Sequence, residues 1–182
     1  MKTTYENYIS QAMRTNSNTV GTYNVHPDLI HSALGLSDEI VELEQAVEKF
    51  DSVNVVEEIS DLFWFTALAA QAADMEFPEH TKAMAAKLSD EMPVLRDSIN
   101  DYVSIIKRWY AYGKVPQEEL TMSIENIYYN LCDTCYSIGM SPDYVMGINI
   151  NKLSVRYPDK FTPEAANNRD VIAERDALSD AQ

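Results

Sequence analysis

The chain has 182 residues, and its 14 Lys and Arg residues against 29 Asp and Glu residues give a formal net charge of −15. Such an acidic protein is not expected to bind nucleic acid or an anionic membrane as its main partner, because both are held by basic patches. Its five glycines form no GxGxxG or GxxxxGK[ST] motif, which excludes the usual phosphate-binding loops.

Helical periodicity runs through nearly the whole chain, and prolines separate its segments. The expected helices cover residues 3–14, 27–50, 53–74, 79–112, 116–139 and 142–156, with a short charged helix in the tail. After Asp61 the third of these is apolar on every side, which predicts a buried central helix with Trp64 in the core. Since no segment shows strand alternation, we expect an all-α helical bundle built on a four-helix core.

The sequence LSDE opens a helical stretch twice, at 36–39 and 88–91. An alignment of the two stretches and the helices that follow them places Ser123 opposite Glu58 and Asn126 opposite Asp61. The apolar positions therefore repeat between the two stretches, while most of the acidic residues of the first have no acidic counterpart in the second. Two interpretations stay open: two tandem hairpins of which the second is degenerate, or the general likeness of any two amphipathic hairpins.

Two acidic pairs lie on consecutive helices. Glu39 and Glu42 are on the helix expected at 27–50, and Glu58 and Asp61 are on the next helix. Carboxylates at i and i+3 project from the same side of a helix, so two antiparallel neighbours can direct all four toward one point. Hard divalent cations such as Mg²⁺ or Mn²⁺ favour that oxygen-rich setting.

The alternative for these acids is a solvated acidic surface, which is common in a chain of this composition. Glu58 and Asp61 share a stripe with Leu62, however, and burying several like charges without a partner costs several kcal/mol each. A bound metal or mutual protonation would remove that cost. Gly35 and Ala46, which flank the first pair, would leave room for a ligand. The residues alone leave both interpretations open.

A second motif, NINKLSVRYPDKF, occupies residues 149–161. Together with GLSDEIVELEQAV and VVEEISDLFWF, it resembles the MazG-like all-α nucleoside triphosphate pyrophosphatases, a superfamily that also holds the dimeric dUTPases and the phosphoribosyl-ATP pyrophosphatases. The resemblance covers about 26–77 and 112–178.

The resemblance implies a Mg²⁺ site, with Mn²⁺ as a possible substitute, whose ligands are Glu39, Glu42, Glu58 and Asp61. Beside them, Asp38 and Glu57 would supply further ligands or a base. The resemblance also implies that Asn149, Lys152 and Arg156, at i, i+3 and i+7 on one helix face, bind the substrate. An amide suits a sugar or base, and two cations suit phosphate oxygens.

The implied reaction is hydrolysis of a (d)NTP between the α and β phosphorus atoms, which yields a nucleoside monophosphate and pyrophosphate. It would serve either control of the nucleotide pool or the removal of non-standard nucleotides (house-cleaning), and the residues leave the base preference open. The implied layout is a single domain. It consists of a metal-binding hairpin at 26–77, a degenerate second hairpin at 79–140 that would act as its built-in partner, a substrate-binding helix at 141–161 and a tail at 162–182. Because members of the family commonly form oligomers, the resemblance also implies a homo-oligomer (a dimer or tetramer). A second hairpin within the chain weakens that expectation, since it would take the place of a partner subunit.

Two rivals to this function are a di-iron bundle and a non-catalytic acidic adaptor. No His follows a Glu by three residues, as the di-iron site requires. The adaptor interpretation draws on the charge of −15 and predicts neither stabilisation by a metal nor nucleotide turnover. Arg169 and Arg175 in the tail are expected on a solvated helix; the alternative for them is a lid over the phosphates.

The start of the chain lacks the apolar stretch of a signal peptide, and the apolar run at 62–73 is too short to cross a bilayer. We therefore expect a cytoplasmic protein without a membrane partner. Cys132 and Cys135 form a single CxxC pair that no further cysteine or histidine pair completes into a zinc site. They are expected to be buried or half-buried free thiols in a reducing compartment.

Overall fold

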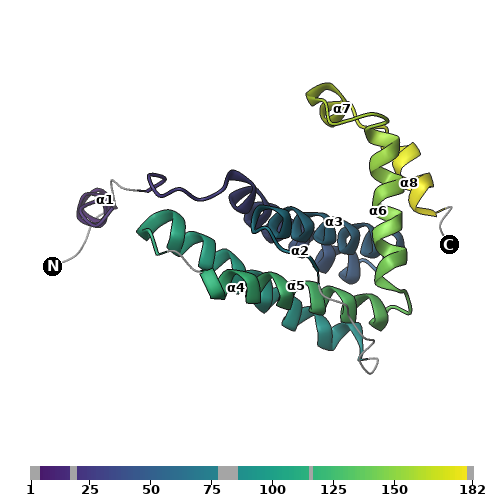
Figure 1. Cartoon of the computed structure of the whole chain (residues 1–182), viewed down its shortest axis with the longest axis horizontal. Coiled ribbons are helices and arrows are strands. Elements are labelled where there is room, and N and C mark those ends of the chain that lie inside the picture. The colour runs from purple at the N-terminus through teal and green to yellow at the C-terminus, as the bar shows by residue number, and fades with distance from the viewer. Residues whose placement is uncertain (1–4, 17–19, 78–85, 115–116, 180–182) are drawn as a thin grey trace.

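The protein is described here by a computed structural model that covers residues 5–16, 20–77, 86–114 and 117–179 (Figure 1). Its helices are α1 (Tyr5–Met13), α2 (Pro27–Glu48), α3 (Ser52–Ala72), α4 (Leu88–Tyr112), α5 (Gln117–Ser137), α6 (Pro142–Arg156), α7 (Pro163–Asn167) and α8 (Val171–Ser179). The described ranges contain no strand, which confirms the all-α prediction.

Two helical hairpins form the body of the molecule. The α2–α3 hairpin lies on the α4–α5 hairpin, with α2 against α4 and α3 against α5 (Figure 1). Apolar side chains from all four helices meet between them and are almost fully buried: Leu36, Leu43, Ile59, Leu62, Leu95, Ile99, Ile124 and Leu131. This four-helix core confirms the predicted helical bundle.

The α2–α3 turn fixes how these two helices face each other. Lys49 ends α2, and Phe50 takes a left-handed backbone conformation with φ of 56°. The Asp51 side chain then caps α3 by accepting a hydrogen bond of 3.2 Å from the backbone N–H of Asn54. So short a turn makes α2 and α3 antiparallel neighbours, and it brings the acids of both helices to the same level.

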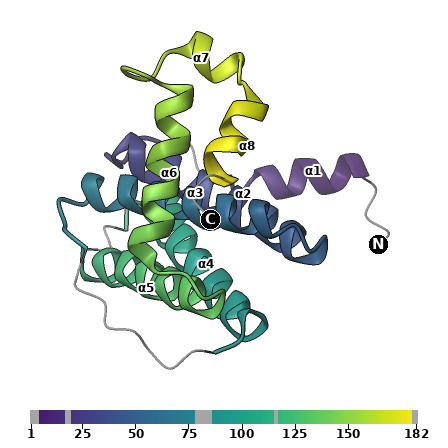
Figure 2. The same ribbon diagram turned by 90° about the vertical axis from the view of Figure 1, so that its right-hand side faces the viewer.

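The C-terminal helices lie across one end of the bundle. Helix α6 crosses α3 and α5, and α8 returns to lie against α6 and α3 (Figure 2). Leu178 of α8 is buried with Val56 of α3 and Ile148 of α6, which anchors the tail. By contrast, α1 lies apart from the bundle (Figure 1). No helix in the described part of the chain is both long and apolar enough to cross a membrane.

Two expectations about the helices were wrong. Trp64 is 38% exposed: among the aromatic residues described, its ring makes edge contacts only with the His31 and Phe65 rings, and it lies outside the core between the hairpins. The helix expected at 79–112 begins only at Leu88; Ala86 and Lys87 are not helical, and residues 79–85 lie outside the described residues. The helix expected at 142–156 has those bounds, and both cysteines are buried free thiols, as predicted.

Candidate metal and phosphate site

Three of the four predicted ligands come together between α2 and α3. Glu39, Glu58 and Asp61 can each offer one carboxylate oxygen, and these oxygens all lie within 4.8 Å of one another. Glu58 is buried, while Glu39 and Asp61 are half-buried. This donor set suits a hard divalent cation, because such ions prefer several carboxylate oxygens at one point.

The other predicted acids lie around this group. Glu42 is exposed and does not belong to it, although its charge contributes to raising the pKa of Glu39 and of Glu58. Asp38 is exposed on α2. Glu57 is half-buried on α3 and faces the C-terminal helices through contacts described below. The acid cluster is therefore defined as Glu39, Glu58 and Asp61, with Glu42 at its rim.

Two members of the acid cluster, Glu39 and Glu58, have raised pKa values. Burial, followed by the charge of Asp61, raises the pKa of Glu39 well above its ordinary value of 4.5. Burial, followed by a hydrogen bond in which protonated Glu58 donates to Glu39, raises the pKa of Glu58 further. Within the described ranges, no ion pair joins either glutamate to a cation. A divalent cation would supply the positive charge that these two carboxylates lack.

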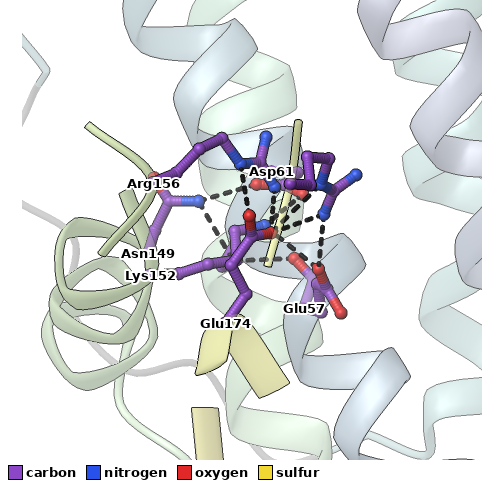
Figure 3. Close-up of polar contacts among 8 residues, drawn as sticks. Glu57, Asp61, Asn149, Lys152, Arg156 and Glu174 are labelled. Carbon is purple, nitrogen blue, oxygen red and sulfur yellow. Dashed lines mark hydrogen bonds and ion pairs between the residues drawn. The ribbon is translucent and has the colours of Figure 1, made fainter. Parts of the chain in front are cut away.

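Helix α6 brings the second sequence motif onto the acid cluster at Asp61 (Figure 3). The Asn149 amide donates hydrogen bonds to Asp61 Oδ1 at 2.8 Å and to Ser60 Oγ at 3.2 Å. The Lys152 ammonium donates to Asp61 Oδ2 at 2.5 Å and to Glu57 Oε1 at 3.4 Å. Lys152 is only 1% exposed. Two motifs about 90 residues apart in the chain thus meet at one carboxylate.

The third predicted substrate residue, Arg156, lies beside them but bonds to the tail. Its Nε donates to Glu174 Oε1 at 2.9 Å, and its Nη2 donates to the other oxygen. Arg169 donates to Glu174 Oε2 from Nε at 3.1 Å and from Nη2 at 2.7 Å. Burial would raise the pKa of Glu174, but the hydrogen bonds from Arg156 and Arg169 outweigh it and lower that pKa to about 2.

Sequence reasoning missed Glu174 and misplaced Arg169. Arg169 lies between α7 and α8 rather than on a solvated helix, and Arg175 on α8 reaches Asp51 at 3.4 Å. One signal for Glu174 was available: it precedes Leu178 by four residues, so both lie on the face of α8 that is buried.

Gly35 and Ala46 do not leave room for a ligand. A Cβ placed on Gly35 would lie 2.2 Å from a ring carbon of Phe65, so the space belongs to that ring. Ala46 is 1% exposed and is part of the core. The missing side chain at Gly35 therefore serves the close approach of α2 and α3, one turn before Glu39.

The second hairpin carries no equivalent cluster at the aligned positions. Ser123 is buried and donates a hydrogen bond to the carbonyl of Leu120, and Asn126 is exposed. Both line a polar pocket of about 300 Å³ between α4 and α5, together with the ion pair of Arg108 and Glu119. The α2–α3 hairpin alone supplies the acid cluster.

Comparisons with protein-family models, with curated proteins and with solved structures found no match to this chain. The MazG-like resemblance therefore depends on the sequence motifs alone.

Proposed function

We propose that this chain is a nucleoside triphosphate pyrophosphohydrolase that uses Mg²⁺, or Mn²⁺ in its place, to convert a (d)NTP into a (d)NMP and pyrophosphate. The observation that carries the proposal is the meeting at Asp61, where an acid cluster suited to a cation directly adjoins Asn149 and Lys152 of α6. A metal–triphosphate complex needs such a pair of surfaces, one anionic for the ion and one cationic for the phosphates.

The residues of the site would have different roles in binding the ion and the substrate. Glu39, Glu58 and Asp61 would hold the ion, and the charge of Glu42 would add to the negative potential there. When bound, such an ion neutralises phosphate charge and lowers the pKa of a coordinated water. Lys152 and Arg156 would hold phosphate oxygens, and the Asn149 amide would bind a sugar or base.

Glu57 is better placed than Asp38 to orient a water molecule at the phosphate chain. Its Oε1 lies 3.4 Å from Lys152, on the side of α3 that faces the cations, whereas Asp38 is exposed on α2. We propose a role in control of the cytoplasmic nucleotide pool, since removal of a triphosphate is the net result of this reaction.

A panel of ribo- and deoxyribonucleoside triphosphates with Mg²⁺ tests the proposal. Ion-exchange chromatography should resolve monophosphate with pyrophosphate as the products of at least one member, and EDTA should stop the reaction. Diphosphate with phosphate as products would contradict the cleavage position. No turnover together with no stabilisation by Mg²⁺ would instead favour the non-catalytic acidic adaptor.

The stabilisation of the fold by Mg²⁺ should grow with pH. The raised pKa values of Glu39 and Glu58 mean that, without a cation, the folded chain keeps protons that the unfolded chain releases, so its stability falls as pH rises above 4.5. A cation competes with those protons and removes the loss. Thermal melts should therefore show a larger Mg²⁺-induced rise in Tm at about pH 8.5 than at about pH 6. An equal rise at both pH values would contradict the assignment of these carboxylates as ligands.

A further inference from the structure

The tail gathers two guanidinium groups on one buried carboxylate. Glu174 is 2% exposed and accepts hydrogen bonds from Arg156 of α6 and from Arg169 of the α7–α8 connection (Figure 3). Two guanidinium groups repel each other at this range, and a buried carboxylate without partners is costly. Glu174 therefore stabilises the two arginines side by side, and they in turn compensate its buried charge.

This arrangement extends the cationic surface of α6. The Nη2 atom of Arg169 lies 3.8 Å from Glu57 Oε1, the same oxygen that lies 3.4 Å from Lys152. Lys152, Arg169 and Arg156 therefore follow one another along a network in which they alternate with the carboxylates of Asp61, Glu57 and Glu174. We refer to these three residues as the cationic row.

Both arginines keep donors for a ligand. A guanidinium has five N–H donors, and the hydrogen bonds of Arg156 and Arg169 to Glu174 start from Nε and Nη2. None of these bonds to Glu174 starts from an Nη1 group, so Nη1 of Arg169 can donate to a different acceptor, while Arg156 has a further hydrogen bond to Tyr157. The Arg169 side chain is 43% exposed, against 15% for Arg156, so Arg169 is the more accessible of the two.

We propose that Arg169 is a third phosphate-binding cation of this site, and that Glu174 is a positioning residue that holds Arg169 and Arg156 side by side. The proposal rests on the proposed function and names the ligand class as the polyphosphate part of the substrate, which becomes pyrophosphate on release. Planar guanidinium groups suit this ligand because they give two parallel hydrogen bonds to phosphate oxygens. A carboxylate that fixes them beforehand reduces the entropy lost on binding.

Arg169→Gln tests the first part, and Arg175→Gln is its matched control. Arg175 carries the same charge in the same segment, but it pairs with Asp51 at the surface. The probe is inorganic pyrophosphate with Mg²⁺, titrated by calorimetry into the full-length chain. Arg169→Gln should weaken binding about tenfold or more, and Arg175→Gln less than about twofold. Equal effects of the two variants, or no effect of Arg169→Gln, would overturn the proposal.

Glu174→Gln tests the second part, because it keeps the shape of the side chain and removes its charge. If Glu174 positions the arginines, pyrophosphate binding should weaken about tenfold and KM for the triphosphate should rise more than kcat falls. If the tail instead blocks the site, the same variant would bind pyrophosphate more tightly, and the positioning role would be wrong. Glu174→Asp should restore part of the binding, which a purely structural role does not predict. Circular dichroism and Tm show whether Glu174→Gln folds. If it does not fold, Arg169→Lys replaces it as the test of positioning. Arg169→Lys should then bind pyrophosphate more weakly than wild type and more tightly than Arg169→Gln.

These tests remain informative if hydrolysis is not found. Pyrophosphate binding that is lost in Arg169→Gln but kept in Arg175→Gln would support the cationic row even in a chain that hydrolyses no nucleotide. Hydrolysis that proceeds unchanged in Arg169→Gln would support the proposed function and overturn the role of Arg169.

Discussion

Replacing Glu58 with glutamine should abolish Mg²⁺-dependent hydrolysis while making the cation-free fold more stable. Loss of a ligand from the acid cluster should lower kcat at least about a thousandfold, equivalent to about 4 kcal/mol of transition-state free energy. The fold should gain because burial raises the pKa of Glu58, so the ionised side chain is unfavourable at neutral pH. The amide of the introduced glutamine would still donate the hydrogen bond that protonated Glu58 donates to Glu39.

The gain in stability is a specific signature of this site. We expect a rise in Tm of a few degrees at about pH 8, measured by calorimetry without divalent cations. Glu48→Gln is the control, because Glu48 is an exposed acid on α2 and its replacement should change neither activity nor Tm. Full activity of the Glu58 variant would refute the assignment of the acid cluster as the metal site.

Asp61→Asn should abolish hydrolysis as Glu58→Gln does, but it should lower the Tm of the cation-free fold instead of raising it. Asp61 accepts hydrogen bonds from Lys152 and Asn149, so its neutralisation leaves the buried ammonium of Lys152 with Glu57 alone, at 3.4 Å, as a charged partner. Opposite shifts in Tm from two neighbouring acid-to-amide changes are not expected for a solvated acidic surface, where both shifts would be small.

Much of this site could be predicted because it depends on helical spacing. The i, i+3 rule placed Glu39, Glu58 and Asp61 near one another once α2 and α3 were known to be antiparallel. The same rule placed Asn149 and Lys152 on one face of α6. Residues three or four positions apart always lie on the same side of a helix, so these groupings can be predicted from the sequence alone.

The remainder depends on tertiary contacts that have no period. An apolar surface all round α3 cannot indicate which side neighbouring helices leave open, so the exposure of Trp64 could not be predicted. Arg169 lies between two short helices, and its contact with Glu57 depends on how far the tail turns back along α6. Glu174 is a charged residue in a charged tail; its spacing from Leu178 indicates a buried position, but no sequence pattern indicates the two arginines that it meets there.

Lys152 is the residue whose loss should separate the binding of the ion from the binding of the phosphates. Its ammonium is 1% exposed and lies 2.5 Å from Asp61, where it supplies the positive charge that a divalent cation would also supply. Lys152→Met keeps the volume of the side chain and removes that charge. We expect the cation-free variant to lose about 2 kcal/mol, less than for a fully buried ion pair because the Asp61 side chain is 24% exposed.

Addition of Mg²⁺ should then stabilise Lys152→Met more than it stabilises the wild-type chain, because the ion no longer competes with the ammonium for Asp61. The loss of about 2 kcal/mol corresponds to roughly 4–8 °C in Tm, which is large enough to follow by calorimetry with and without the ion. Turnover should nevertheless fall at least about a hundredfold, since the ammonium is also the nearest cation for the phosphates. Lys107→Met, at an exposed lysine of α4, is the control for the loss of one positive charge.

The double variant Lys152→Met with Asp61→Asn completes the argument, because it removes both members of the pair. Its cation-free Tm should recover most of what the single lysine variant loses, while the additional stabilisation by Mg²⁺ should disappear along with one ligand. If Mg²⁺ stabilises Lys152→Met no more than wild type, then the lysine and the ion do not share Asp61. The acid cluster and the cationic row would in that case be two separate sites, and a single metal–triphosphate complex could not span them as proposed.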